Sequence, residues 1–108
     1  MEKIKKYETL IIDLLNSIKG ASLDNFVIVD KEKRHYQLLN VGNDNRNRYF
    51  SQVRIHFYLR DDAVICLYEN RTEEEIGDTL IAQGVPKSDI LVGFLPQNAR
   101  QYAGYATA

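Results

Sequence analysis

The chain has 108 residues, enough for one domain whose core needs no metal or disulfide to hold it together. Its 44% hydrophobic and 27% charged residues are typical of a soluble globular protein, and its one cysteine excludes an internal disulfide framework and a cysteine-based zinc site. No apolar segment reaches the roughly 18 residues needed to cross a bilayer, and the N-terminus lacks a signal-peptide core. We therefore expect a cytoplasmic protein without membrane contact.

Residues 3–19 are predicted to form an amphipathic helix that Gly20 ends. Apolar side chains recur there at three- and four-residue steps, and three more widen the apolar face: Leu10, Ile12 and Leu15. The wide face indicates either deep burial within the domain, which we favour, or cover by a partner. The stripe itself consists of Ile4, Tyr7, Ile11, Leu14 and Ile18.

Four strands are predicted next, at residues 26–29, 35–41, 53–60 and 63–68. The third alternates almost without fault, with one set of side chains toward the core and the other toward solvent. Short links between sequential strands favour an antiparallel four-stranded meander. The core-facing set is Val53, Ile55, Phe57 and Leu59, and the outward set is Arg54, His56, Tyr58 and Arg60.

A second helix is predicted to begin at Thr72, because Thr72 and Glu75 have the spacing of a capping box. Gly84 would end this helix and Pro86 would prevent its continuation. An extended run follows at residues 89–94, and Pro96 is expected to start a short last helix. The order helix, four strands, helix, strand, helix predicts an α+β fold, with residues 1–108 as a single domain.

The net charge of −1 is unevenly distributed. Residues 31–60 carry seven basic and two acidic side chains, a local charge of +5, whereas residues 61–108 carry three basic and eight acidic ones, a local charge of −5. Such a dipolar chain suits a charged partner or a second copy of itself, and with the wide helix face it predicts a homo-oligomer. The seven basic residues are Lys31, Lys33, Arg34, Arg46, Arg48, Arg54 and Arg60.

The sequence indicates no catalytic residue, no metal site and no cofactor. Neither His35 nor His56 is followed by a second ligand at metal-binding spacing, and no serine elbow or phosphate-binding glycine cluster occurs. We expect His56 to lie on the polar face of its strand, hydrogen-bonded to water. Cys66 lies in an apolar run and is expected to be a small buried hydrophobe.

The polar segment 42–48, GNDNRNR, allows three interpretations. Gly, Asn and Asp tolerate positive φ, so it can be no more than a hairpin connection. Alternatively, its arginines belong to a basic surface formed by the seven residues above, and arginine binds a partner's carboxylates or a phosphate equally well. Tyr49, Phe50 and Tyr58 are interleaved with that surface and could stack on bases.

Three motifs lie in different parts of the chain: Asp30-x-Glu32-x-x-His35-Tyr36-Gln37-Leu38-Leu39-x-Val41-Gly42, then Gly84-Val85-Pro86-Lys87-x-Asp89-Ile90, then Gly93-Phe94. They belong to a resemblance that extends over essentially the whole chain. In these the chain resembles the fdxN-element excision controlling factors, the XisI-like family of cyanobacteria. It departs from the family pattern where tryptophan is common, with Asn43 and Cys66 instead.

The resemblance implies a small non-catalytic accessory protein that controls DNA excision by binding a XisH-type, nuclease-like partner. The alternative is a direct DNA-binding accessory factor for recombination, so DNA contact is expected directly or through the partner. The motif also bears on strand 35–41, where alternation leaves apolar residues on both faces. We expect the first helix to cover one face and a second subunit or the partner to cover the other.

Overall fold

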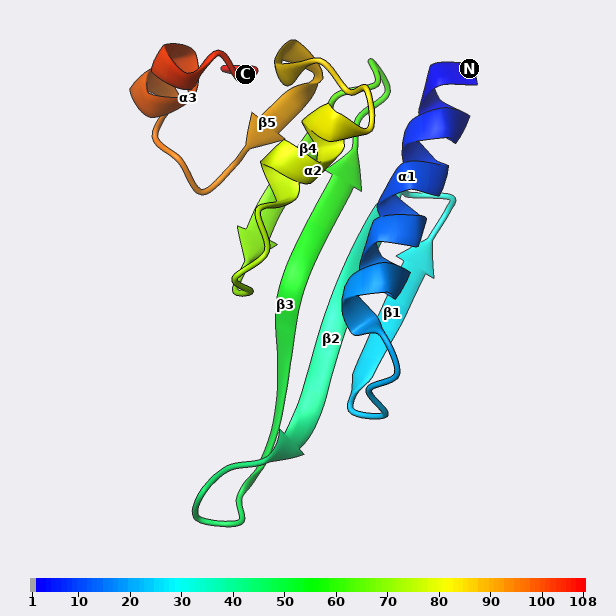
Figure 1. The fold of residues 1–108 in the computed structure, drawn as a ribbon, viewed down its shortest axis with the longest axis vertical. Helices are drawn as coiled ribbons and strands as arrows, with labels where there is room; N and C mark the ends of the chain where they lie inside the picture. The colour runs from blue at the N-terminus through cyan, green and yellow to red at the C-terminus, as the bar shows by residue number, and fades with distance from the viewer. Residues whose placement is uncertain (1) are drawn as a thin grey trace.

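The computed structural model describes residues 2–108 and measures 43 × 30 × 24 Å along its principal axes. One sheet carries α1 and α2 on the same face, and α3 lies beyond its far edge (Figure 1). The elements are α1 (Glu2–Lys19), β1 (Asn25–Asp30), β2 (His35–Asn43), β3 (Tyr49–Leu59), β4 (Ile65–Asn70), α2 (Ile76–Ala82), a 3-10 turn (Lys87–Asp89), β5 (Ile90–Val92) and α3 (Gln97–Ala103).

The strand order in the sheet is β1-β2-β3-β4-β5, with the first four strands antiparallel and β5 parallel to β4. The α+β class and the meander are therefore confirmed. The further strand joins the same sheet, which has five strands rather than four. Its parallel pairing requires a crossover, and α2 supplies it (Figure 1).

The core lies between the helices and one face of the sheet. On β3, Ile55, Phe57 and Leu59 are fully buried, as predicted. The prediction is wrong for Val53, which is only partly buried, because a bulge shifts the alternation: Ile55 pairs with the buried Leu38, whereas Val53 pairs with Leu39. From α1 the core receives Tyr7, Ile11 and Leu15, and the other apolar side chains of that helix are partly buried against the same cluster. The first helix thus covers one face of the sheet, as expected from the sequence.

The β2–β3 hairpin is longer and its loop shorter than predicted. Gly42 and Asn43 still pair with Phe50 and Tyr49, so only residues 44–48 form the connection. Asp44 organises this loop, since its Oδ1 accepts the backbone N–H groups of Arg46 and Arg48, each at 2.9 Å. Those two hydrogen bonds lower the pKa of the Asp44 carboxyl.

The predicted start of the second helix at Thr72 is wrong, because α2 begins four residues later with Glu75 as its N-cap. Asn70 takes Thr72 into a local turn: its Oδ1 accepts both the backbone N–H and the hydroxyl of Thr72, at 3.0 and 2.6 Å. Asparagine and threonine side chains compete with helix formation in this way. The capping-box spacing is present, but Thr72 is held in the turn by Asn70 and does not cap α2.

Chain reversals elsewhere follow the sequence more closely. Gly20 and Gly84 end α1 and α2 with φ of +58° and +95°, a conformation that strains other residues. Pro96 is the N-cap of α3, as predicted. The extended run 89–94 is shorter in the structure, where β5 covers only Ile90–Val92 after the 3-10 turn. None of the helices within residues 2–108 is long and apolar enough to cross a membrane.

Candidate functional site on the open face of the sheet

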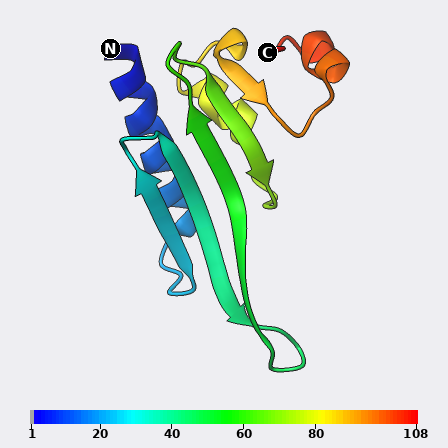
Figure 2. The ribbon, with the colours of Figure 1, turned by 180° about the vertical axis from the view of Figure 1, so that it is seen from behind.

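The face of the sheet turned away from α1 and α2 carries no helix from residues 2–108, as the view from behind shows (Figure 2). We call it the open face. Its side chains alternate with those of the core, so the same strands supply both. Phe26, Ile28 and Tyr68 are 46%, 45% and 43% exposed, high values for large apolar side chains. The open face consists of Phe26, Ile28, His35, Gln37, His56, Tyr58 and Tyr68.

Four of these side chains form a continuous group of rings across β2, β3 and β4: His35, His56, Tyr58 and Tyr68. We call this group the ring row. The rings of His35 and Tyr58 stack with centroids 4.7 Å apart, and Tyr58 stacks on Tyr68 at 6.2 Å. His56 meets Tyr68 edge-on at 5.4 Å. Cross-strand aromatic pairs stabilise a sheet, so we expect the ring row to strengthen the pairing of these three strands.

The two histidines of the ring row are joined by a hydrogen bond of 2.9 Å between His35 Nδ1 and His56 Nε2. One nitrogen must donate and the other accept, so the two rings cannot both be fully protonated while the bond holds. Burial, and then the nearby His35, lower the pKa of His56, while the negative charge of Glu69 opposes them. The expectation that His56 is hydrogen-bonded to water is corrected: its partner is His35.

The His35–His56 pair offers nitrogen ligands, yet no third histidine, cysteine, aspartate or glutamate gathers beside it within residues 2–108. Cys66, next along the face, is 1% exposed, and burial raises the pKa of its thiol. The prediction of a small buried hydrophobe at this position is confirmed. The imidazoles of His35 and His56 can exchange a proton through their hydrogen bond.

The seven basic residues predicted to form one surface are spread along the molecule. Lys31, Lys33 and Arg34 occupy the turn between β1 and β2, whereas Arg46 and Arg48 lie in the loop at the other end of β2. A nine-residue strand separates these turns by about 27 Å. The two remaining residues lie along β3: Arg54 at a bulge and Arg60 just past the strand's end.

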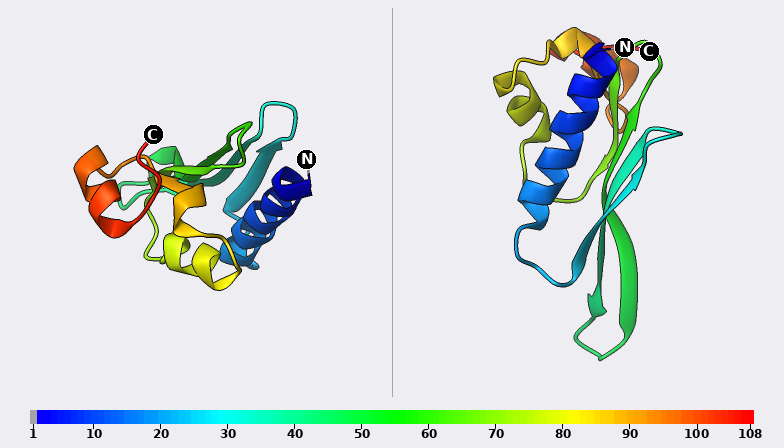
Figure 3. Two further views of the ribbon diagram at one scale, coloured as in Figure 1. Left: turned by 90° about the horizontal axis from the view of Figure 1, so that it is seen from above. Right: turned by 90° about the vertical axis from the view of Figure 1, so that its right-hand side faces the viewer.

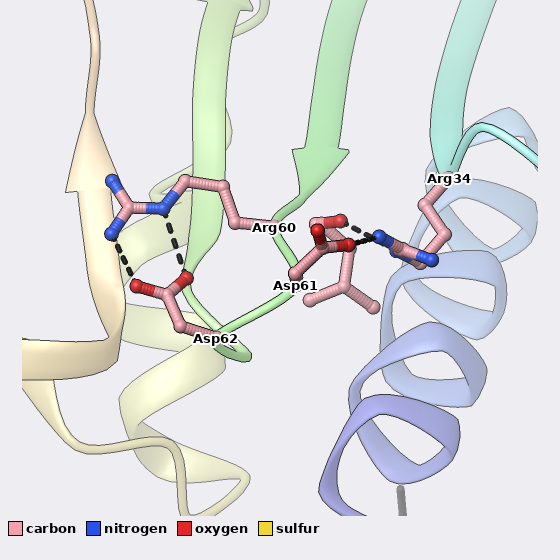
Figure 4. A network of polar contacts seen from close by, with 5 residues as sticks. Arg34, Arg60, Asp61 and Asp62 are labelled. Carbon is pink, nitrogen blue, oxygen red and sulfur yellow. Dashed lines mark hydrogen bonds and ion pairs between the residues drawn. The ribbon is translucent and has the colours of Figure 1, made fainter.

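Three of the arginines are engaged with carboxylates nearby. Arg34 donates to Asp61 and to the carbonyl of Leu59, and these contacts join the β1–β2 turn to the β3–β4 turn (Figure 4). Within the β3–β4 turn, Arg60 donates to both carboxylate oxygens of Asp62. Arg48 pairs with Asp44 at 2.9 Å. Within residues 2–108, the basic residues of the set without an ion pair are Lys31, Lys33, Arg46 and Arg54.

Two of the family-motif residues hold α1 against the sheet. Tyr36 is fully buried and its hydroxyl donates to Glu8 at 2.5 Å. Asp89 accepts the hydroxyl of Tyr7 at 2.6 Å and forms an ion pair with Lys3 at 2.8 Å. Burial, together with the carboxylate in each pair, raises the pKa of both tyrosines well above the usual range. These residues stabilise the fold.

Other motif residues shape turns. Asp30 Oδ1 accepts the backbone N–H groups of Glu32 and Lys33, which closes the β1–β2 turn. A Cβ at Gly93 would lie 2.8 Å from the ring of Tyr68, and one at Gly42 would lie 3.2 Å from the ring of Phe50.

The remaining motif positions divide between the fold and the surface. Gly84 and Pro86 lie at the end of α2 and the start of the 3-10 turn. His35 and Gln37 lie on the open face, and Phe94 is 53% exposed beyond β5. The motif therefore contains both buried residues and residues on the surface.

Sequence reasoning missed the ring row, although it placed His56 and Tyr58 on one face of their strand. The position of the polar loop was a usable signal. Strands that pair about a hairpin centred near Arg46 bring His35 opposite Tyr58, as observed. The register shifts between Leu38 and Leu39, which requires a bulge that the sequence does not reveal. Tyr68 lies at a second bulge, between the paired residues of β3 and β4.

Comparison with known proteins supplies a family. The family model described as "XisI protein" matches residues 1–107. The fold is similar to that of a XisI-like protein from Anabaena variabilis ATCC 29413, with a TM-score of 0.83, 34% identity, and 97% of this chain and 99% of that chain covered. It is also similar to the fdxN element excision controlling factor XisI from the same organism, with a TM-score of 0.81, 21% identity, and 98% and 99% covered. A search of curated protein sequences finds no match.

Proposed function

Because this chain belongs to the XisI family, we propose that it is a non-catalytic accessory protein that binds a XisH-type, nuclease-like partner in the control of DNA-element excision. The match to the family model over residues 1–107 carries this proposal. A protein of the same fold is described as an excision controlling factor, which supports a regulatory role for this chain. The partner and its mode of binding are our inference.

The open face and the nearby hairpin suit contact with a protein. Phe26, Ile28 and Tyr68 expose apolar surface of the kind that fills the centre of an interface. Arg46 and Arg54, which form no ion pair within residues 2–108, are available to a partner's carboxylates. Arg48 is less suitable, because it already holds Asp44 and thereby the loop.

The polar groups of the fold support a role without catalysis. The buried tyrosine hydroxyls donate to Glu8 and Asp89, in contacts that hold α1 in place. The acidic side chains of the β3–β4 turn pair with arginines. No pocket opens among the described residues, whereas substrates of enzymes are usually enclosed in one. Contact through a surface fits this structure better than chemistry in a cavity.

Co-expression with a XisH-type protein, with a tag on that protein alone, tests the proposal. We expect a stoichiometric complex by light scattering. The double variant Arg46→Glu, Arg54→Glu should weaken the complex at least tenfold, because each reversed charge meets the carboxylate it formerly attracted. The matched control is Lys5→Glu, Lys6→Glu, which reverses two exposed charges on α1. Separate elution of the two wild-type proteins would overturn the proposal.

Direct DNA binding is the competing outcome. The paired turns at the two ends of β2 place Lys31 and Lys33 about 27 Å from the loop of Arg46, so these charges do not converge on one phosphate. Retention of DNA by the purified chain at low salt, with affinity falling steeply as salt rises, would favour this alternative. We expect no retention without the protein partner.

A further inference from the structure

The two edges of the sheet differ in how they are protected. At one edge, β5 has only three residues, and the carbonyl of Ile90 accepts the backbone N–H of Ala106 at 2.9 Å. The C-terminal segment therefore occupies that edge, and the C-terminus and the first turn of α1 lie at the same end of the molecule's long axis (Figure 3). Short edge strands covered by another segment are a usual protection against unwanted pairing.

The opposite edge lacks these protections. β1 has six residues, and within residues 2–108 its one strand neighbour is β2. Its sequence, NFVIVD, contains no proline or lysine, and the bulges of the sheet lie between β2 and β3 and between β3 and β4. Phe26 and Ile28 are almost half exposed beside this edge. A regular apolar edge strand of this kind is a template for another strand.

We propose that β1 pairs in an antiparallel manner with β1 of a second copy, about a two-fold axis perpendicular to the sheet, with Val27 opposite Val27. The two sheets then become one ten-stranded sheet, and the open faces of the two copies become continuous. The helices of both copies stay together on the other side. This contact goes beyond the proposed function and does not depend on it.

The chemistry of β1 selects a second copy as the occupant. Residues opposite each other in an antiparallel pair point to the same face, so the exposed Phe26 of one copy must meet an even-numbered residue of the other. With Val27 on the axis, that residue is Ile28, and the contact occurs twice. Each copy thus packs beside the apolar side chain that the other exposes, as an isologous interface requires, and both side chains remain on the continuous open face.

The same register predicts the strength of the contact. Asp24 of one copy comes opposite Asp30 of the other at each end of the paired segment, and like charges opposite each other oppose pairing. Salt screens exposed charges over about 10 Å at 0.1 M. We therefore expect a weak dimer that tightens as salt rises, the reverse of a contact driven by opposite charges.

Cysteine pairs test both the contact and its register. Directly opposite residues have Cα atoms about 4.5–5.5 Å apart, within reach of a disulfide. We expect a mixture of Phe26→Cys and Ile28→Cys proteins to form a covalent heterodimer under mild oxidation, and either protein alone to form far less. A Leu23→Cys protein mixed with Phe26→Cys provides the control for random collision, since Leu23 is 88% exposed but lies outside β1. Equal cross-linking in all mixtures would overturn the register.

Sedimentation of the protein without cysteine changes tests the dimer itself. Ile28→Lys should raise the dimer dissociation constant at least tenfold, because lysine at an edge opposes strand pairing. Leu23→Lys introduces the same charge at an exposed apolar side chain outside the strand and should leave association unchanged. Amide exchange in β1 that slows with protein concentration would support the contact. A chain that remains monomeric up to about 1 mM would overturn it.

Discussion

The two faces of the sheet are made by the same strands and yet differ in burial and in side-chain chemistry. On β3, Phe57 is fully buried in the core beneath α1, while its neighbour Tyr58 stacks on His35 on the open face. The core face is aliphatic and aromatic and contains no buried polar residue among those described. The open face mixes imidazole, phenol and exposed apolar side chains. Burial and exposure are thus separated by the alternation of side chains along one strand.

Substitution of adjacent residues on β3 should show this separation most strongly. Phe57→Ala is expected to lower the free energy of unfolding by about 3–5 kcal/mol, because it removes a fully buried ring and leaves a cavity. Tyr58→Ala should cost far less, since its ring is only half-buried. Urea unfolding of both variants measures the difference. Similar losses would mean that the open face also contributes to the core.

A smaller effect is expected where the core face uses a polar group. Tyr36→Phe keeps the buried ring but removes the hydroxyl that donates to Glu8. Hydrogen bonds to charged groups contribute about 1.5–3 kcal/mol, and we expect a loss near the lower end because Glu8 is half exposed. Tyr49→Phe, at a tyrosine that is 73% exposed, is the control and should not change the unfolding midpoint.

The open face should give a pH dependence in the range where histidine titrates. The pKa of His56 is lower in the folded protein than in the unfolded chain, so the unfolded chain binds more protons. The contribution of His56 is therefore present above about pH 6.5 and is lost as the pH falls. Denaturant unfolding at about pH 7.5 and pH 5.5 should show a lower free energy of unfolding at pH 5.5. The groups that face His56 and its ring row are His35, Glu69, Tyr58 and Tyr68. His56→Gln should reduce this dependence, and Arg54→Gln should preserve it.

The smallest effect is expected at the hairpin loop, beyond both faces. Arg48→Gln removes an ion pair with Asp44 whose partners are largely exposed, and such pairs contribute little to stability. The unfolding midpoint should stay within the error of the wild-type value. A clear loss would show that the Arg48 side chain, and not only its backbone N–H, fixes the loop.

Periodic patterns within single elements predicted much of the fold. The steps of three and four residues identified α1, and the alternation of Ile55, Phe57 and Leu59 identified the buried face of β3. Gly20 and Pro96 marked real element ends. The capping-box spacing predicted the wrong start for α2, because Thr72 donates its hydrogen bonds to Asn70, a residue outside the motif.

The candidate site was less accessible to sequence reasoning. Most of the basic residues are close in the sequence but lie in the turns at opposite ends of β2, because the length of an extended strand separates the two turns. The ring row joins residues 35, 56, 58 and 68, which come together through strand pairing. Two bulges set the final offset, and a shift of one residue would have turned the side chains to the opposite face.

Patterns in the sequence indicated where the helices and strands lie, which side chains of most strands enter the core, and the family that the chain resembles. The three-dimensional arrangement was needed to show that His35 binds His56, that the C-terminal segment covers β5, and that β1 has a single strand neighbour within residues 2–108. The physical reason is that side-chain alternation is a local property of the backbone. The partner across a strand depends instead on register, which is set by loops, bulges and packing summed over the whole chain.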